Sequence, residues 1–392
     1  MTVFFFSGRY NNSISKPHTY RHTSTLHFES MASAWRRRRD AFMLKVDPVH
    51  VVSVVRYRPE TRCDAPVPVI VIHGGPGAAS NVKHLTVLNR RQFDVVIFDQ
   101  RGCGRSTPTA CLRRNTTQHL VDDIEKVRAA VRRRTGDRCW DRAVVFGSSF
   151  GAVLAVLYAS QYPEHVRAVV AHGFTRLQTF FSPKLRRTYP AIWSCLERAV
   201  DDHPRTAPPM KKPPATRVVV RKTRNRRQRR TVRVTRSPPS HPLYARCLRA
   251  LQRGSYRVIR AWSALEGLRT QLSPATQLRH PPRRPHARMH TLALIECHYA
   301  AHDSFLPPGG IALPEIQARL ARNSFPIELT HGADDVICDV ADARALCARV
   351  PRARLSVIPH AGHDMSEPAT HHCLCTIFAR LADDHAAIGR RR

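Results

Sequence analysis

The sequence AVVFGSSFGAVLAVLY, at residues 143–158, decides the fold of this chain. Its first four residues are apolar, as in a short buried strand, and the residues after Gly151 form an apolar helical run. Between the two, Gly147-Ser148-Ser149-Phe150-Gly151 has the form G-x-S-x-G. A strand, a sharp turn at this motif and a helix together hold a serine hydroxyl above the edge of a sheet. We therefore expect Ser149 to be the nucleophile of an α/β-hydrolase fold.

The segments on both sides of this motif alternate between strand-like and helix-like patterns. Strands are expected at residues 67–72, 93–99, 166–170, 325–330 and 354–358, and helices at 115–136, 152–162 and 341–350. Asn115 or Thr116 can cap the first of these helices. Near-continuous apolar strands that alternate with helices indicate a mostly parallel sheet with helices on both faces.

The alternation stops between residues 174 and 320, where long helical patterns such as 256–272 predict a helical cap inserted into the α/β domain. Two basic, Pro- and Arg-rich insertions interrupt this cap, at about 205–240 and 279–288. The expected order is a disordered basic extension (1–40), the first part of the hydrolase core (41–173), the cap (174–320), the second part of the core (321–386) and a basic tail (387–392).

The formal net charge of +35 is concentrated in particular segments. Residues 205–236 alone carry thirteen Lys or Arg and no acid. Such a segment repels itself and buries little apolar surface, so we interpret it as solvated. It carries no interleaved aromatic residues and no nucleic-acid-binding motif, so no nucleic-acid partner is expected beyond non-specific electrostatic attraction.

Eleven cysteines are scattered along the chain, an odd number and no disulfide framework. No Cys/His cluster has a persuasive metal-ligand spacing, so no metal is expected. Free thiols fit a reducing compartment, and we expect the cytoplasm. The Ser-, Thr-, His- and Arg-rich residues 1–39 leave organellar targeting as an alternative. No apolar run is long enough to span a membrane, and the oligomeric state is left open.

A serine nucleophile needs a base to accept its proton and an acid to orient that base. In this fold the chain order is nucleophile, acid, base, each following a strand. Asp334 and Asp335 follow the strand at 325–330, and His360 and His363 follow the last strand. Spacing alone allows either aspartate and either histidine.

The tetrahedral intermediate also needs backbone N–H donors for its oxyanion. The residue after the nucleophile, Phe150, supplies one donor in this fold. The second is expected from the loop HGGPG at residues 73–77, where Gly75 is the candidate.

Several of these stretches resemble the proline iminopeptidase (prolyl aminopeptidase) family of α/β-hydrolases, which are serine peptidases. The matching stretches are HGGPG at 73–77, DQRGCGRS at 99–106, NTT at 115–117, the serine motif with YASQYPEHV at 158–166, GADDVIC at 332–338 and AGH at 361–363. The resemblance implies a triad of Ser149, Asp335 and His363. It also implies release of an N-terminal proline from short peptides through a prolyl-enzyme intermediate, without a cofactor.

Two segments of the expected cap extend the resemblance. Residues 261–267 (AWSALEG) resemble the family's W-x-x-x-E segment, and residues 295–299 (IECHY) resemble its I-E-x-H-Y segment. The family uses these glutamates to hold the free amino group of the substrate, which implies this role for Glu266 and Glu296. The serine motif departs from the family's usual G-G-S-W-G, with Phe150 in place of tryptophan.

Two other functions fit parts of the sequence. One is an esterase or other small-molecule hydrolase on the same fold, which would cleave acyl esters but not proline amides. The other is a nucleic-acid-binding protein on an inert hydrolase scaffold, supported only by the basic residues 205–236.

Overall fold

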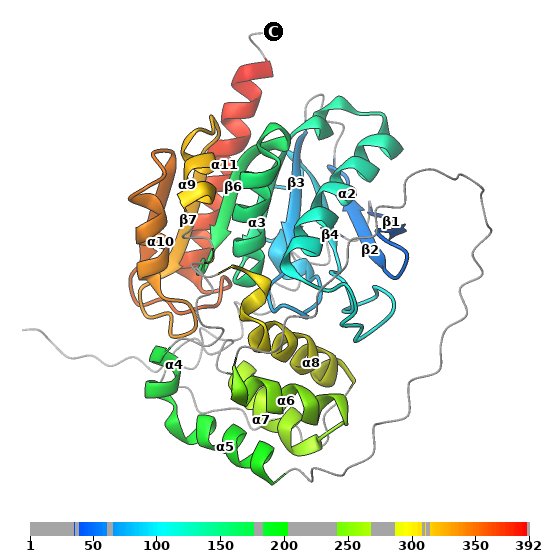
Figure 1. Ribbon diagram of the computed structural model, residues 1–392. Coiled ribbons are helices and arrows are strands. Elements are labelled where there is room, and N and C mark those ends of the chain that lie inside the picture. The colour runs from blue at the N-terminus through cyan, green and yellow to red at the C-terminus, as the bar shows by residue number, and fades with distance from the viewer. Residues whose placement is uncertain are drawn as a thin grey trace, which may run out of the picture.

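The computed structural model (Figure 1) describes Trp35 and residues 39–60, 66–175, 183–202, 241–267, 287–307, 310 and 314–389. The expected insertion at 205–240 lies outside the described residues. So do the expected N-terminal extension, apart from Trp35, Arg39 and Asp40, and most of the second insertion.

In the described part of the chain, eight strands form one sheet in the order β1-β2-β4-β3-β5-β6-β7-β8. The strands are β1 (Arg39–Lys45), β2 (Val51–Tyr57), β3 (Val67–Ile72), β4 (Phe93–Phe98), β5 (Ala143–Ser148), β6 (Val166–His172), β7 (Ile327–Gly332) and β8 (Ala353–Ile358). β1 and β2 run antiparallel to their neighbours, and β4 to β8 in the sheet order are parallel. The expected α/β-hydrolase class is confirmed.

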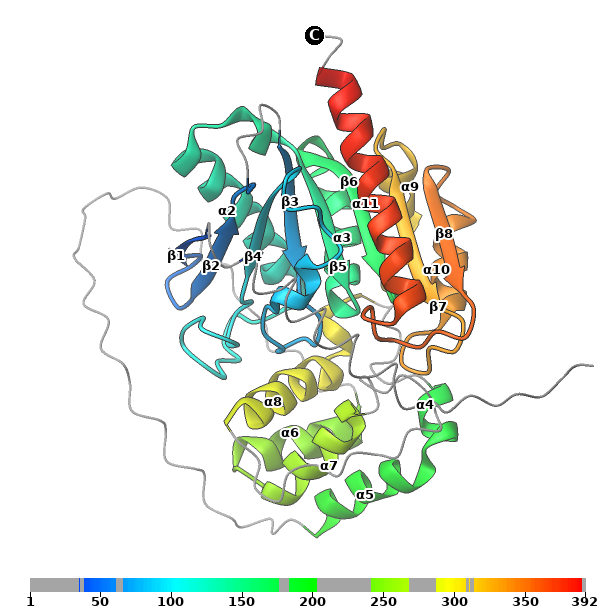
Figure 2. The same ribbon diagram turned by 180° about the vertical axis from the view of Figure 1, so that it is seen from behind.

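Alternating side chains of the central strands build two hydrophobic cores, one on each face of the sheet. On β3, for example, Ile70 and Ile72 face one core while Val69 and Val71 face the other. The helices α2 (Thr117–Thr135), α3 (Phe150–Gln161), α9 (Pro314–Ala321) and α10 (Val340–Cys347) cover the first face. The long helix α11 (Pro368–Gly389) covers the second (Figure 2). Helices on both faces are what buried parallel strands require.

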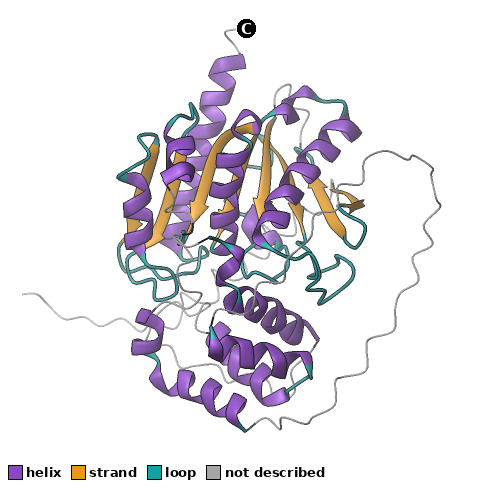
Figure 3. Cartoon of the chain, in the orientation of Figure 1, coloured by secondary structure: helices purple, strands orange, loops and turns teal. Residues whose placement is uncertain are grey.

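The cap consists of α4 (Pro183–Thr188), α5 (Pro190–Asp201), α6 (Pro242–Gln252), α7 (Tyr256–Gly267) and α8 (Ala287–Ala301). It lies beyond the carboxyl ends of the parallel strands (Figure 3). Trp193, Tyr244 and Trp262 pack in a hydrophobic core of the cap's own. This core also takes in Ile337 and Cys338, which belong to the loop after β7. The cap therefore packs directly on the edge of the sheet where an α/β protein carries its site.

Helix α8 contributes to two cores at once. Ile295 and Tyr299, one turn apart, pack into the core of the α/β domain. Leu294, Cys297 and Ala301 on the opposite side pack into the core of the cap. The helix is therefore apolar around most of its circumference, as a helix buried between two layers has to be.

Several details differ from the sequence expectations: β1, β2 and α11 were not expected, and β7 was expected at residues 325–330. Thr116 is the N-cap of α2, but its side chain makes no capping hydrogen bond. The side-chain amide of Asn115 instead donates to the carbonyls of Arg101 and Cys111, so this side chain bonds to the preceding loop and does not cap the helix. At the other end of the chain, α11 continues to Gly389, into the expected basic tail.

Short 3-10 turns complete the described elements, namely η1 (Val82–Leu85), η2 (Arg138–Asp141), η3 (Pro163–His165) and η5 (Asp303–Phe305). None of the helices in the described ranges combines the length and apolar character that crossing a membrane requires.

Candidate active site

Ser149 lies at the turn between β5 and α3, where the sequence predicted it. Its backbone has φ 57° and ψ −124°, a strained conformation for a residue with a side chain. The start of α3 packs closely on β3, since a Cβ atom at Gly151 would lie 2.2 Å from the carbonyl oxygen of Ile72. The N–H of Ser149 donates to the carbonyl of His172 at the end of β6, at 2.8 Å. Packing and hydrogen bonding thus hold the strained serine in place at the start of a helix.

The HGGPG loop lies against this turn. A Cβ atom built on Gly74 would lie 3.1 Å from the Cβ of Ser149 and 3.7 Å from the backbone nitrogen of Phe150. The next loop of the chain braces it, since the N–H of Gln100 donates to Nε2 of His73 at 3.0 Å. The side-chain amide of Gln100 donates to the carbonyl of His73 at 2.7 Å. Sequence reasoning placed Phe150 and Gly75 as oxyanion donors, and both belong to these two adjoining segments.

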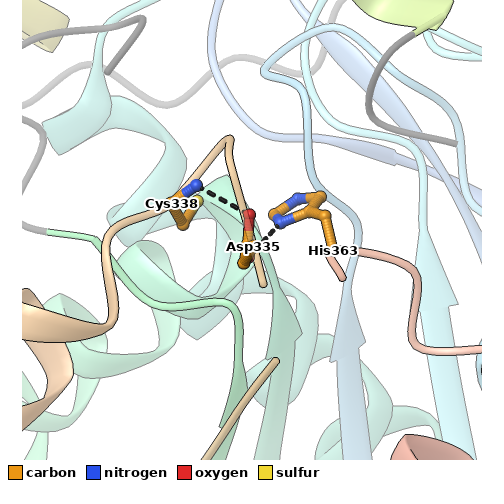
Figure 4. A group of neighbouring side chains, drawn as sticks. All are labelled: Asp335, Cys338 and His363. Atoms are coloured by element: carbon orange, nitrogen blue, oxygen red, sulfur yellow. Dashed lines mark hydrogen bonds and ion pairs between the residues drawn. The ribbon is translucent and has the colours of Figure 1, made fainter. Parts of the chain in front are cut away.

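Asp335 and His363 come together at the carboxyl ends of β7 and β8. Nδ1 of His363 lies 2.7 Å from Oδ2 of Asp335, and Oδ1 of Asp335 accepts the N–H groups of Ile337 and Cys338 at 2.8 and 2.9 Å. Figure 4 shows Asp335 between Cys338 and His363. The alternatives that spacing left open, Asp334 and His360, are both exposed. The geometry therefore pairs the aspartate and histidine that the family resemblance implied.

Glu296 lies on α8, the cap helix that packs against the serine turn. Glu296 is fully buried, and its Oε2 accepts the indole N–H of Trp262 at 2.8 Å. The neighbouring Ile295 reaches the HGGPG loop, where a Cβ atom on Gly77 would come within 2.8 Å of the Ile295 Cβ. One turn further on, the ring of Tyr299 meets the ring of Phe150 edge-on at 5.4 Å. Glu296 thus sits on a helix that touches both the HGGPG loop and the serine turn.

Glu266 lies one turn after Trp262 on α7, which packs against α8 in the cap core. Both sequence-predicted glutamates therefore come from adjacent cap helices.

Comparison with known proteins identifies the family of this chain. A proline iminopeptidase of Xylella fastidiosa (strain Temecula1) is 32% identical over 306 residues, which cover 77% of this chain and 84% of that protein. This chain belongs to the proline iminopeptidase family. A proline iminopeptidase of Arabidopsis thaliana is 26% identical over 330 residues, 83% of this chain and 75% of that protein. The family model described as the alpha/beta hydrolase fold matches residues 67–195.

A solved structure supports the fold independently. The crystal structure of a haloalkane dehalogenase loop variant from Bradyrhizobium elkanii covers 90% of this chain and 100% of that chain, with a TM-score of 0.52 and 14% sequence identity. At that identity the likeness concerns the fold alone.

The protonation states of Asp335 and His363 are set by burial and by their mutual contact. Burial by itself would raise the pKa of Asp335, but the charge and hydrogen bond of His363 hold that pKa well below its usual value. Burial opposes a charge on His363, yet Asp335 raises its pKa well above the usual value. An imidazole base acts only when neutral, so activity that depends on His363 should increase as the pH rises.

Sequence reasoning missed His172, which links the serine turn to the histidine loop. Its carbonyl accepts from the N–H of Ser149. Its Nε2 lies 3.2 Å from the carbonyl of His363, and its Nδ1 lies 3.0 Å from the hydroxyl of Thr330. Since a carbonyl only accepts, Nε2 carries the proton and Nδ1 accepts from Thr330. Burial, followed by repulsion from His363, lowers the pKa of His172 to about 4, so it is neutral in the working enzyme.

The available signal for His172 was its place just after the strand expected at residues 166–170. Among the many histidines of the sequence, that position was the only clue.

Proposed function

We propose that this proline iminopeptidase family member releases N-terminal proline from short peptides, using Ser149, His363 and Asp335 as a triad. The observation that carries the proposal is the 2.7 Å contact between His363 and Asp335 at the strand edge that also carries the strained Ser149 turn. Family membership supplies the substrate class. No metal or organic cofactor takes part in this chemistry.

The reaction begins when Ser149 attacks the first peptide carbonyl and His363 accepts its hydroxyl proton at Nε2. Asp335 accepts the hydrogen bond of Nδ1 and so fixes the tautomer in which Nε2 is free to act as the base. The N–H groups of Phe150 and Gly75 receive the oxyanion. His363 then returns the proton to the leaving amine, and water hydrolyses the prolyl-enzyme by the same route.

The substrate's ammonium is held by Glu266 and Glu296 in this proposal. A protonated amine that enters a closed pocket needs a carboxylate partner, because an unpaired buried charge is costly. The support is the complete burial of Glu296 on a helix that contacts both the HGGPG loop and the serine turn. A free N-terminus is therefore part of what the site selects.

The test is the turnover of proline para-nitroanilide by the wild type and by Ser149→Ala, Asp335→Asn and His363→Ala. Each variant should lose most of its activity while it keeps its circular dichroism spectrum. Because triad members act as a unit, a double variant should be little worse than the worst single variant. Full activity in Ser149→Ala would exclude this mechanism, and full activity in Asp335→Asn would assign the acid to another residue.

A further inference from the structure

Cys338 stands beside the catalytic pair without a role in the proposed reaction. It is 3% exposed and belongs to the loop that follows β7. Its backbone N–H donates to Oδ1 of Asp335 at 2.9 Å, which folds the loop back on itself (Figure 4). Its side chain is thereby carried toward the Asp335–His363 contact.

Three different donor atoms meet at this point. Sγ of Cys338, a carboxylate oxygen of Asp335 and a ring nitrogen of His363 all lie within 4.8 Å of one another. Cys338 and Asp335 are buried, and 9% of the His363 side chain is exposed. Asp335 and Cys338 share one loop, but α10 and β8 separate His363 from them, so no metal-ligand spacing was visible in the sequence.

These three types of donor atom together favour one kind of cation. Thiolate, imidazole and carboxylate together are typical of zinc, whereas magnesium and calcium take oxygen ligands. Two ligands on one tetrahedral zinc lie about 3.3–3.6 Å apart, given bonds of about 2.0–2.3 Å. The separations in the trio, none above 4.8 Å, are therefore at most about 1 Å longer than that range. One thiolate and one carboxylate also neutralise the two charges of the ion.

We propose that Asp335, Cys338 and His363 form an inhibitory site for zinc. The Cys338 thiol gives its proton to solvent, and Nδ1 of His363 binds the ion in place of its proton. That ring proton moves to Nε2, so the imidazole becomes a donor where the reaction needs an acceptor. Ser149 then has no base, and the enzyme stops until the ion leaves. The inhibition rests on the proposed function of the triad, but the binding of the ion does not.

Binding is tested first, without any substrate, by titrating the purified full-length protein with cobalt as a spectroscopic substitute for zinc. A cobalt–thiolate bond gives a charge-transfer band in the near ultraviolet, and excess zinc should abolish that band. The band should be lost in Cys338→Ala and Cys338→Ser and kept in Cys347→Ser, a matched change at a thiol on α10. Persistence of the band in both Cys338 variants, or its absence in the wild type, would overturn the site.

Inhibition is tested second, with each variant measured against its own metal-free rate on proline para-nitroanilide. Loss of a ligand should raise the zinc concentration for half-inhibition by at least roughly tenfold in both Cys338 variants, and a chelator should restore the wild type. Equal zinc sensitivity of the wild type and the Cys338 variants would contradict the proposal. A protein that shows the Cys338-dependent band but never cleaves proline amides would keep the metal site and refute the proposed function instead.

Discussion

Glu296→Gln isolates the contribution of one buried carboxylate to substrate binding. Glutamine keeps an oxygen that can accept the indole N–H of Trp262, now 2.8 Å from Oε2, so the local packing should survive. The negative charge is lost, and a buried charge pair broken on one side costs about 2–5 kcal/mol. Since 1.4 kcal/mol is about a factor of ten, kcat/KM for a free proline amide should fall roughly thirtyfold to several thousandfold.

The assay compares three substrates on the wild type and the variant: proline para-nitroanilide, its N-acetyl derivative and an uncharged acyl ester. The variant should lose activity on the free amide and much less on the ester, which has no ammonium. The wild type should cleave the acetylated amide poorly. Glu328→Gln is the matched control, because Glu328 is a buried carboxylate on β7 that pairs with Arg380, at 2.7 Å.

Equal losses on the amide and the ester would show that Glu296 supports the cap rather than the ammonium. Efficient cleavage of the acetylated amide by the wild type would remove the aminopeptidase function and favour the esterase alternative.

Three other outcomes are expected. Asp335→Asn should lower kcat by a factor on the order of 10⁴. The acid limb of the pH profile of the remaining activity should move to lower pH, because the variant lacks the carboxylate that raises the pKa of His363. Gly77→Ala should cost about 1–3 kcal/mol of stability by overpacking, since its Cβ would approach Ile295 to 2.8 Å, in addition to the strain of its φ of 92°. Thermal melts of a double-mutant cycle should show that the same change costs less in an Ile295→Ala background than in the wild type. The free energy of unfolding should fall as the pH drops from about 6.5 towards 4, because the pKa of His172 is lowered to about 4 in the folded protein and the unfolded chain binds the proton first. Urea titrations should show a smaller fall for His172→Gln than for the wild type. An identical fall in both proteins would mean that other groups cause it.

Local sequence predicted the serine turn well, because its determinants are local. A short apolar strand, glycines that allow close backbone approach and an apolar helix all lie within residues 143–158. The positive φ of Ser149 follows from that arrangement. The acid and base were harder, since each has a neighbour of the same type, and only side-chain direction separates the buried Asp335 from the exposed Asp334.

What the sequence could not predict depends on contacts between distant segments. His172 reaches the serine turn because β6 pairs with β5 and β7, and no local sequence motif marks this residue. Asn115 was a reasonable helix cap by its position, but tertiary carbonyls compete for its amide. Cys338 meets His363 only because two loops fold to the same strand edge.

The double packing of α8 determines how members of this family could exchange parts. A chimera that cuts the chain at the expected cap boundaries, residues 174 and 320, would import a foreign α8 whose Ile295 and Tyr299 equivalents have to fit the host's glycine loop and Phe150. A cut before Ala287 would leave α8 with its own α/β domain and replace only the layer formed by α4 to α7. In assembly terms, the α/β domain resumes at Ala287, the first residue of the helix that carries Glu296.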